Sequence, residues 1–288
     1  MSAGTATIGG LDIGAHGAGT MNLSGTAVVN AGGVSISDAI TGQGVNGGAS
    51  GTPGGLLRVT GGTINALSLT IGNTNTTNQG AGELQVVGNA GNLIFKAGAG
   101  SSAMQTLANS TLDFQIGSGG VSTITADGGG TTSATSDGRD VVALSGLLQL
   151  DLLNGFTPAK GALYTLISTN VISSTYSYKN SNGDTIVVTL PGIVTGAGVD
   201  LPNYNNNYHP PGLTYPDPGT YITNTGLSLA PADASNWHLL VTTLGSGATE
   251  TTVLQAEYIG PVPEPASLAL LAAAGAGLLL LSRRRRPA

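Results

Sequence analysis

The sequence has no cysteine and few charged or aromatic residues. Of its 288 residues, 8% are charged and 4% are aromatic. The lack of cysteine excludes disulfides, thiolate nucleophiles and metal–thiolate sites. Basic residues are especially scarce before residue 261, where five stand against fourteen acidic ones and leave a net charge of −9. A nucleic-acid partner needs a basic surface, so this composition excludes one.

Glycine and apolar residues are, in contrast, abundant. The 47 glycines and 13 prolines make up about a fifth of the chain, less than the ~25–30% that is typical of low-complexity disorder. Hydrophobic residues amount to 40% and supply a core. We therefore expect a folded body rather than a disordered one.

Residues 1–126 contain short, imperfect repeats. Three segments read G-x-[ML]-x-[LV]-x-G with offsets of 36 and 27 residues, at 19–25, 55–61 and 82–88. A second element recurs between them, at 11–14, 34–37 and 69–72. Each alternates apolar and polar residues beside glycine, as a short strand with one buried face does.

A strand of this kind cannot bury its apolar side alone, so the copies must stack. We predict an all-β protein whose body is a parallel β-helix, or β-solenoid, with glycine at the corners. An antiparallel sandwich is the alternative, because it also consists of regularly spaced short strands.

The sequence pattern changes after residue 126, where the short repeats end. Residues 127–190 are predicted to hold a glycine-rich connector, the final rungs and a capping β region, since an uncovered solenoid end promotes aggregation. Residues 191–260 form a Pro/Tyr-rich loop and the last strands. Prolines make regular structure unexpected over 191–226, whereas 237–241 and 252–256 read as a strand pair that meets the edge of the cap.

The chain ends in an uncharged apolar run and four arginines. Residues 266–281 contain seven Leu, six Ala, two Gly and one Ser. As a helix this run is about 24 Å long, somewhat shorter than the ~30 Å hydrocarbon layer, but arginine stems reach the interface and bilayers thin locally. A buried core helix is the alternative. We predict a single transmembrane helix over 266–282, stopped on the cytoplasmic side by Arg283, Arg284, Arg285 and Arg286.

Together with Val262, Pro263, Glu264 and Pro265, this helix and its arginines resemble the PEP-CTERM sorting signal, also catalogued as an ice-binding protein C-terminal domain. The resemblance covers residues 261–288. It implies a membrane-bound precursor, recognition near Pro263-Glu264-Pro265 by an exosortase, removal of the helix, and delivery to the cell surface. It also implies a link to exopolysaccharide and biofilm matrix. The body repeats are loosely similar to the β-strand repeats of autotransporter-associated surface proteins.

Export also requires an N-terminal signal with a charged start and an apolar run of about seven or more residues. Residues 1–8, MSAGTATI, have neither. We therefore expect the natural start to lie upstream of Met1.

Candidate catalytic and cofactor residues are few. Residues 42–47 match the dinucleotide fingerprint G-x-G-x-x-G, but 48–54 cannot start the helix that this site needs. The carboxylates Asp127, Asp137 and Asp140 could serve glycoside hydrolysis or weak calcium binding, yet they lie on a connector and read as solvated turn residues. The three histidines are far apart in sequence, at His16, His209 and His238. We predict no catalytic residue, no metal, no cofactor and no enzymatic activity.

Two further groups of residues suggest binding roles. Aromatic faces can stack on sugar rings. We therefore predict that a glycan could contact Tyr204, Tyr208, Tyr215 and Tyr221. An outward threonine array could order water in an ice-binding protein, although no regular T-x-T ladder occurs among Thr60, Thr63, Thr70, Thr74, Thr76 and Thr77.

The sequence thus favours an exported structural protein of the cell surface or extracellular matrix. Its predicted partners are the membrane of the cell envelope, an exosortase and exopolysaccharide. A carbohydrate-binding adhesin is the main alternative. An ice-binding protein and a polysaccharide-degrading enzyme follow.

Overall fold

The structure is a computed structural model. The structure describes residues 1–14, 18–36, 53–72, 81–98, 102–128, 141–179, 185–197, 199–202, 221–224 and 226–261.

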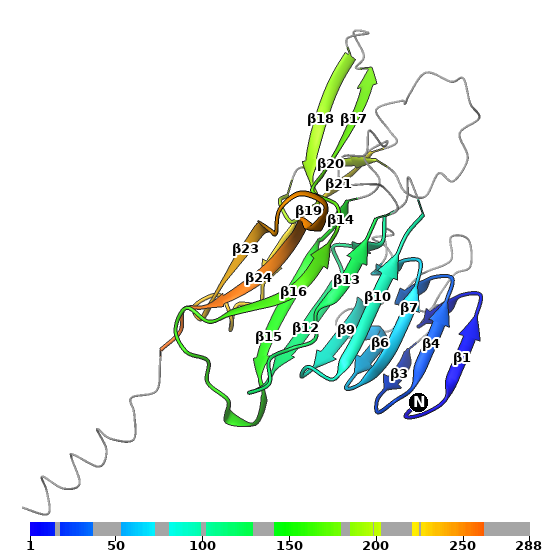
Figure 1. The fold of residues 1–288 in the computed structure, drawn as a ribbon, viewed down its shortest axis with the longest axis vertical. Coiled ribbons are helices and arrows are strands. Elements are labelled where there is room, and N and C mark those ends of the chain that lie inside the picture. The colour runs from blue at the N-terminus through cyan, green and yellow to red at the C-terminus, as the bar shows by residue number, and fades with distance from the viewer. Residues whose placement is uncertain are drawn as a thin grey trace, which may run out of the picture.

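The chain winds through three sheets, visiting them in turn, so that strands three apart in sequence lie side by side (Figure 1). Sheet A has the order β1 (Thr5–Ile8), β4 (Val28–Ala31), β7 (Gly62–Ala66), β10 (Gly91–Lys96), β13 (Ile124–Asp127), β16 (Leu163–Thr169), β24 (Thr251–Tyr258), β23 (Trp237–Leu244). Sheet B runs β2 (Leu11–Ile13), β5 (Val34–Ile36), β8 (Leu69–Ile71), β11 (Met104–Thr106), β14 (Val142–Ala143), β19 (Ile193–Val194). Sheet C runs β3 (Gly19–Leu23), β6 (Pro53–Val59), β9 (Ala81–Val87), β12 (Ser110–Ile116), β15 (Gly146–Leu152), β22 (Leu227–Leu229).

Neighbouring rungs pair in parallel in all three sheets, from β1 with β4 through β15 with β22. The prediction of an all-β body with stacked parallel strands is confirmed, and the antiparallel sandwich is wrong. Within the part of the chain that the structure describes, no helix is long and apolar enough to cross a membrane. The predicted transmembrane helix 266–282 and the glycine motif 42–47 lie outside that part.

The register is the one that the repeats imply. Gly19 faces Gly55, which faces Gly82 on the next rung. In sheet B, Leu11 faces Val34, which faces Leu69. The repeat offsets therefore equal the length of one turn of the solenoid, including its corners.

Apolar side chains form columns along the inside of each sheet. In sheet A one column consists of Val29, Ile64, Leu93, Ile124 and Ile167, all buried. In sheet C the corresponding column contains Leu57, Leu84, Leu112 and Leu148. Each such side chain contributes about 1.5–3 kcal/mol on burial, and it does so only when rungs lie above and below it.

Large and small residues alternate along another inward column of sheet A. Phe95 is fully buried and faces Ala66 on one neighbouring rung and Ala126 on the other. The small alanines leave room for the phenylalanine ring, as close packing of neighbouring rungs requires.

The C-terminal end is closed by a reversal of strand direction. β16 pairs in parallel with β13 on one side and antiparallel with β24 on the other, and β23 completes the hairpin. The strand pair expected from 237–241 and 252–256 is this hairpin.

Sequence reasoning was wrong about regular structure in 191–226. That segment contains β19, which extends sheet B, and β20 (Val199–Pro202) paired with β21 (Tyr221–Asn224). Pro191 and Pro202 do not prevent this, because each lies in a two-stranded hairpin, where both strands are edge strands that tolerate proline. A second hairpin, β17 (Ser173–Lys179) with β18 (Thr185–Pro191), projects away from the sheets (Figure 1).

The column packing predicts a large difference between inward and outward substitutions on one strand. Phe114→Ala on β12 should lower the free energy of unfolding by about 3–5 kcal/mol, because Phe114 is fully buried. Thr111→Ala, on the outward side of the same strand, should change it by less than about 1 kcal/mol. Urea unfolding of both variants measures this, and similar losses would contradict the assignment of faces.

Candidate functional site

Three aromatic rings hold the C-terminal hairpin against the last rung of sheet A. Trp237 begins β23, is 2% exposed and packs edge-to-face against Tyr258 of β24, with ring centroids 5.1 Å apart. Tyr164 of β16 also packs edge-to-face against the indole, with ring centroids 5.9 Å apart. Such contacts add about 0.5–1.5 kcal/mol each beyond the burial of area.

The chain is held by hydrogen bonds up to Pro261. The backbone N–H groups of Ile259 and Gly260 both donate to the carbonyl of Asn236, at 2.8 and 3.1 Å. The Tyr258 hydroxyl donates to the Pro261 carbonyl at 3.1 Å. A Cβ atom on Gly260 would lie 2.7 Å from that hydroxyl, so a larger residue there would displace the Tyr258 side chain. Residues 259–261 are therefore held in place on the body.

A buried carboxylate occupies the outward face of sheet C. Asp113 of β12 is 2% exposed, and its Oδ2 accepts hydrogen bonds from Nε2 of Gln85 at 2.6 Å and of Gln115 at 3.0 Å. Its Oδ1 is buried without a hydrogen-bond partner. Burial raises the pKa of Asp113, the two glutamine hydrogen bonds oppose this, and the nearby Asp151 and Asp233 carboxylates add to it.

Two other carboxyl groups share this environment. Burial and the charge of Asp113 raise the pKa of Glu83. Burial likewise raises the pKa of Asp233, against a hydrogen bond that its Oδ2 accepts from the Leu150 N–H at 3.0 Å. Among the residues that the structure describes, no group of three or more His, Cys, Asp or Glu is arranged to hold a metal ion. Because the pKa values of Asp113, Glu83 and Asp233 are all raised, the stability of the folded protein should depend on pH.

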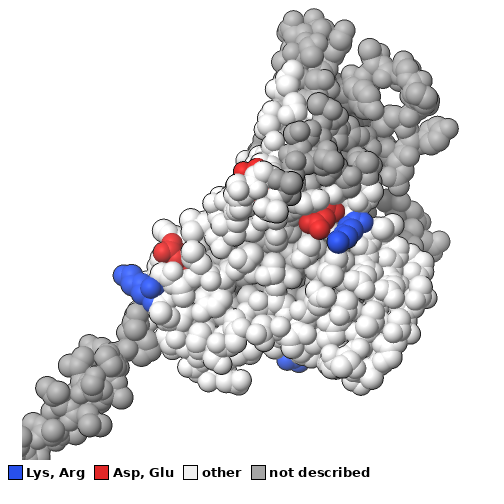
Figure 2. Space-filling view, in the orientation of Figure 1, with Lys and Arg blue, Asp and Glu red and all other residues white. Residues whose placement is uncertain are grey.

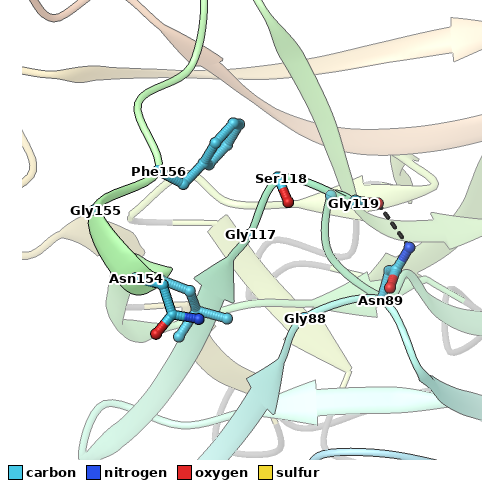
Figure 3. Close-up of a pocket in the computed structure, with 10 residues that line it drawn as sticks. Gly88, Asn89, Gly117, Ser118, Gly119, Asn154, Gly155 and Phe156 are labelled. Atoms are coloured by element: carbon cyan, nitrogen blue, oxygen red, sulfur yellow. Dashed lines mark hydrogen bonds between the residues drawn. The ribbon is translucent and has the colours of Figure 1, made fainter.

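A pocket of about 330 Å³ lies at the corner between sheets C and A (Figure 3). It is lined by the turns after three successive strands, β9, β12 and β15. Asn89 in the first turn donates through Nδ2 to the carbonyl of Gly119 in the second at 2.7 Å. The third turn contributes Leu153, Asn154, Gly155 and Phe156.

Most residues predicted to carry function lie outside the described part of the chain. These are Val262, Pro263, Glu264 and Pro265; the arginines 283–286; Tyr204, Tyr208 and Tyr215; Asp137 and Asp140; His16 and His209; and Thr74, Thr76 and Thr77.

The remaining predicted residues do not converge on one place. Tyr221 begins β21 and pairs with Pro202. Asp127 ends β13, and its Oδ1 accepts the backbone N–H of Asn170 at 3.1 Å, which ties two rungs together. His238 is exposed on β23. Thr60 follows a strand of sheet C, Thr63 lies in sheet A and Thr70 in sheet B, so they share no face.

Sequence reasoning missed Asp113 and the corner pocket. The register that aligns the repeats places Gln85 and Gln149 beside Asp113 on neighbouring rungs, so the same alignment, extended along sheet C, would have found it. The pocket leaves a weaker signal, which is the increasing length of the corner turns.

Residues 261–286 match the family model of the PEP-CTERM protein-sorting motif. The predicted resemblance of the tail is confirmed, and the motif marks an exported protein that is sorted by an exosortase. The comparison with curated proteins gave no match, and neither did the comparison with solved structures. The ice-binding designation of the tail and the autotransporter-like repeats stay predictions. The matched residues begin at Pro261, whose carbonyl accepts the hydrogen bond from the Tyr258 hydroxyl.

The raised pKa of Asp113 predicts that stability falls with rising pH. The folded state holds the proton more tightly than the unfolded chain, so its contribution is complete below the ordinary value of 3.8 and is lost as pH rises through the raised pKa. Asp113→Asn carries no charge at any pH. Its free energy of unfolding relative to the wild type should therefore increase from about pH 4 to pH 8.

Urea unfolding across this pH range measures the difference. Asp12→Asn, which removes an exposed carboxylate on β2, is the control for loss of a negative charge. A difference between Asp113→Asn and wild type that does not change with pH would contradict the assignment.

Tyr258→Phe should loosen the junction with the tail while the ring packing is kept. Loss of the hydrogen bond to Pro261 should cost about 0.5–1.5 kcal/mol in unfolding and speed proteolytic cleavage after residue 260. The chain's one tryptophan, Trp237, reports unfolding by fluorescence. Tyr164→Phe removes a hydroxyl of the same cluster that makes no hydrogen bond in the described residues, and should leave cleavage unchanged; equal acceleration in both variants would refute the role of Tyr258.

Proposed function

We propose that the protein is a structural component of the cell surface or extracellular matrix, made as a membrane-anchored precursor and released from its anchor by an exosortase. The observation that carries the proposal is the match of residues 261–286 to the sorting motif, whose first residue, Pro261, is hydrogen-bonded to the folded body through Tyr258. Since the motif follows the folded body directly, cleavage within the motif would release the whole body to the cell surface.

The body is suited to a mechanical role. Its rungs repeat in parallel from β1 to β22 and produce an elongated stack of sheets (Figure 1). Charged side chains are sparse on the face shown in Figure 2. Outward residues tie rungs together, as Asn65 does by donating through Nδ2 to Oδ1 of Asn30 at 3.0 Å. Asp127, considered as a catalytic acid from the sequence, is engaged in a tie of the same kind. We therefore propose a non-catalytic role.

The tail would set the location. In the precursor, residues 266–282 cross the inner membrane as a helix, and Arg283 to Arg286 hold its cytoplasmic end. Recognition near Glu264 and cleavage then separate body from helix, and the body reaches the surface or the extracellular matrix. An association with exopolysaccharide in a biofilm is part of this proposal.

The proposal is tested by removing the acidic residue of the sorting motif. In cells that encode the matching exosortase, Glu264→Ala should leave an uncut species in the membrane fraction, whereas the wild-type protein is cut and found at the surface or in the medium. Glu250→Ala, in the turn before β24, is the matched control and should be processed normally. Immunoblots of cell fractions measure this, and normal release of Glu264→Ala would overturn the proposed processing.

A further inference from the structure

The connection that joins a strand of sheet C to the next strand of sheet A differs in length from one turn of the solenoid to another. The connection is short after β6, where residues 60–61 lead into β7, and after β9, where residues 88–90 lead into β10. It lengthens to residues 117–123 after β12 and to 153–162 after β15. The longer turns stand out beyond the shorter one, and the pocket is the space between them.

The walls of the pocket are held in place. Gly117 and Gly120 exchange two backbone hydrogen bonds, at 3.1 and 2.9 Å, which closes the second turn. The Ser122 N–H donates to the Gly88 carbonyl at 2.8 Å, and Asn89 holds Gly119. A Cβ atom on Gly119 would lie 2.9 Å from Asn89 Nδ2, so glycine allows this close approach. The cavity is thus a formed feature, not a gap between free loops.

The lining combines an apolar surface with uncharged polar groups. Phe156 and Leu153 are half-buried, and the other lining residues that the structure describes are Gly, Ser and Asn, which carry no charge (Figure 3). The side chains of Ser118 and Asn154 make no hydrogen bond within the described part of the chain. Their donors and acceptors therefore remain open to a ligand.

Asn154 lies in a tight turn. Asn154 and Gly155 both have positive φ, 53° and 69°, and the Phe156 N–H donates to the Leu153 carbonyl at 2.9 Å, which is a two-residue turn that suits an Asn-Gly pair. The turn places Asn154 at the edge of the pocket (Figure 3).

We propose that the corner pocket binds one or two units of a neutral saccharide. A sugar ring has an apolar C–H face that matches Phe156 and hydroxyl groups that match Asn154, Ser118 and the turn carbonyls. The volume lies at the lower end of the ~300–1,000 Å³ range of ligand pockets, which suits a small ligand. The net charge of −9 before the tail disfavours an anionic sugar. A peptide fits less well, because Gly117 and Gly120 bond to each other and offer no strand edge.

The proposal concerns a binding site and does not depend on the structural role of the body or on the processing of the tail. It also differs from the glycan contact predicted for Tyr204, Tyr208, Tyr215 and Tyr221, since it is argued from the turns after β9, β12 and β15.

The experiment is a saturation-transfer NMR titration of the full chain, kept in a zwitterionic detergent because sugar-based detergents would compete. The probes are cellotetraose, maltotetraose and laminaritetraose, with tetragalacturonate as the acidic counterpart. At least one neutral probe should bind, and more tightly than tetragalacturonate.

Two variants test the pocket itself. Phe156→Ala should weaken binding roughly five- to tenfold. Asn154→Gly should weaken it about three- to tenfold while leaving the urea midpoint unchanged or higher, because glycine adopts positive φ freely. Asn92→Ala, an exposed asparagine on β10, is the control and should bind as the wild type does.

Three outcomes would overturn the proposal. The first is no binding of any neutral probe at millimolar concentration. The second is binding that Phe156→Ala and Asn154→Gly leave unchanged, including binding that instead disappears when the four tyrosines become alanine. The third is tighter binding of tetragalacturonate than of every neutral probe.

Discussion

The structure depends on the contact of each inward side chain with the equivalent side chain one turn away. A single rung is three short strands with one apolar side and cannot remove that side from water by itself. In the stack, Leu84 lies between Leu57 and Leu112 in sheet C, and Ile64 lies between Val29 and Leu93 in sheet A. Each rung thus buries the apolar side chains of its neighbours. The two end rungs lack one neighbour, so their apolar side chains must be covered in another way.

At the C-terminal end the residues that close the stack also hold the first residue of the sorting motif. The antiparallel hairpin of β23 and β24 ends the growth of sheet A, and the rings of Trp237, Tyr258 and Tyr164 hold it there. The same Tyr258 binds the carbonyl of Pro261, the first matched residue of the motif. The closure of the body and the presentation of its tail therefore rely on one small cluster.

Much of this fold could be predicted because repeats record the register directly. Aligning residues 19–25 with 55–61 and 82–88 by their glycines places Leu23 beside Val59 and Val86, and the strands pair in that way. The class of the tail was equally accessible, since its apolar run and arginines are local features of the sequence.

The remaining features depend on contacts that no local pattern records. The strands β19 and β22 are short and lie outside the repeated segments, so no repeat marks them, and they are fixed by their parallel neighbours β14 and β15. Burial of Asp113 results from Gln85 and Gln115 lying beside it on the sheet, not from the character of its own strand. The corner pocket requires three turns of unequal length to lie one above another.

Cross-linking between rungs tests the stacked register most directly. The chain has no native cysteine, so a disulfide between introduced residues is unambiguous. Thr63 and Asn92 face each other on β7 and β10. Strands in a sheet lie about 4.7–4.9 Å apart, within disulfide reach. Oxidation of the Thr63→Cys, Asn92→Cys double variant should therefore join the two residues in nearly every molecule, whereas Thr63→Cys with Ile94→Cys, two residues out of register, should remain reduced. Equal cross-linking of both pairs, or of neither, would contradict the stacked register.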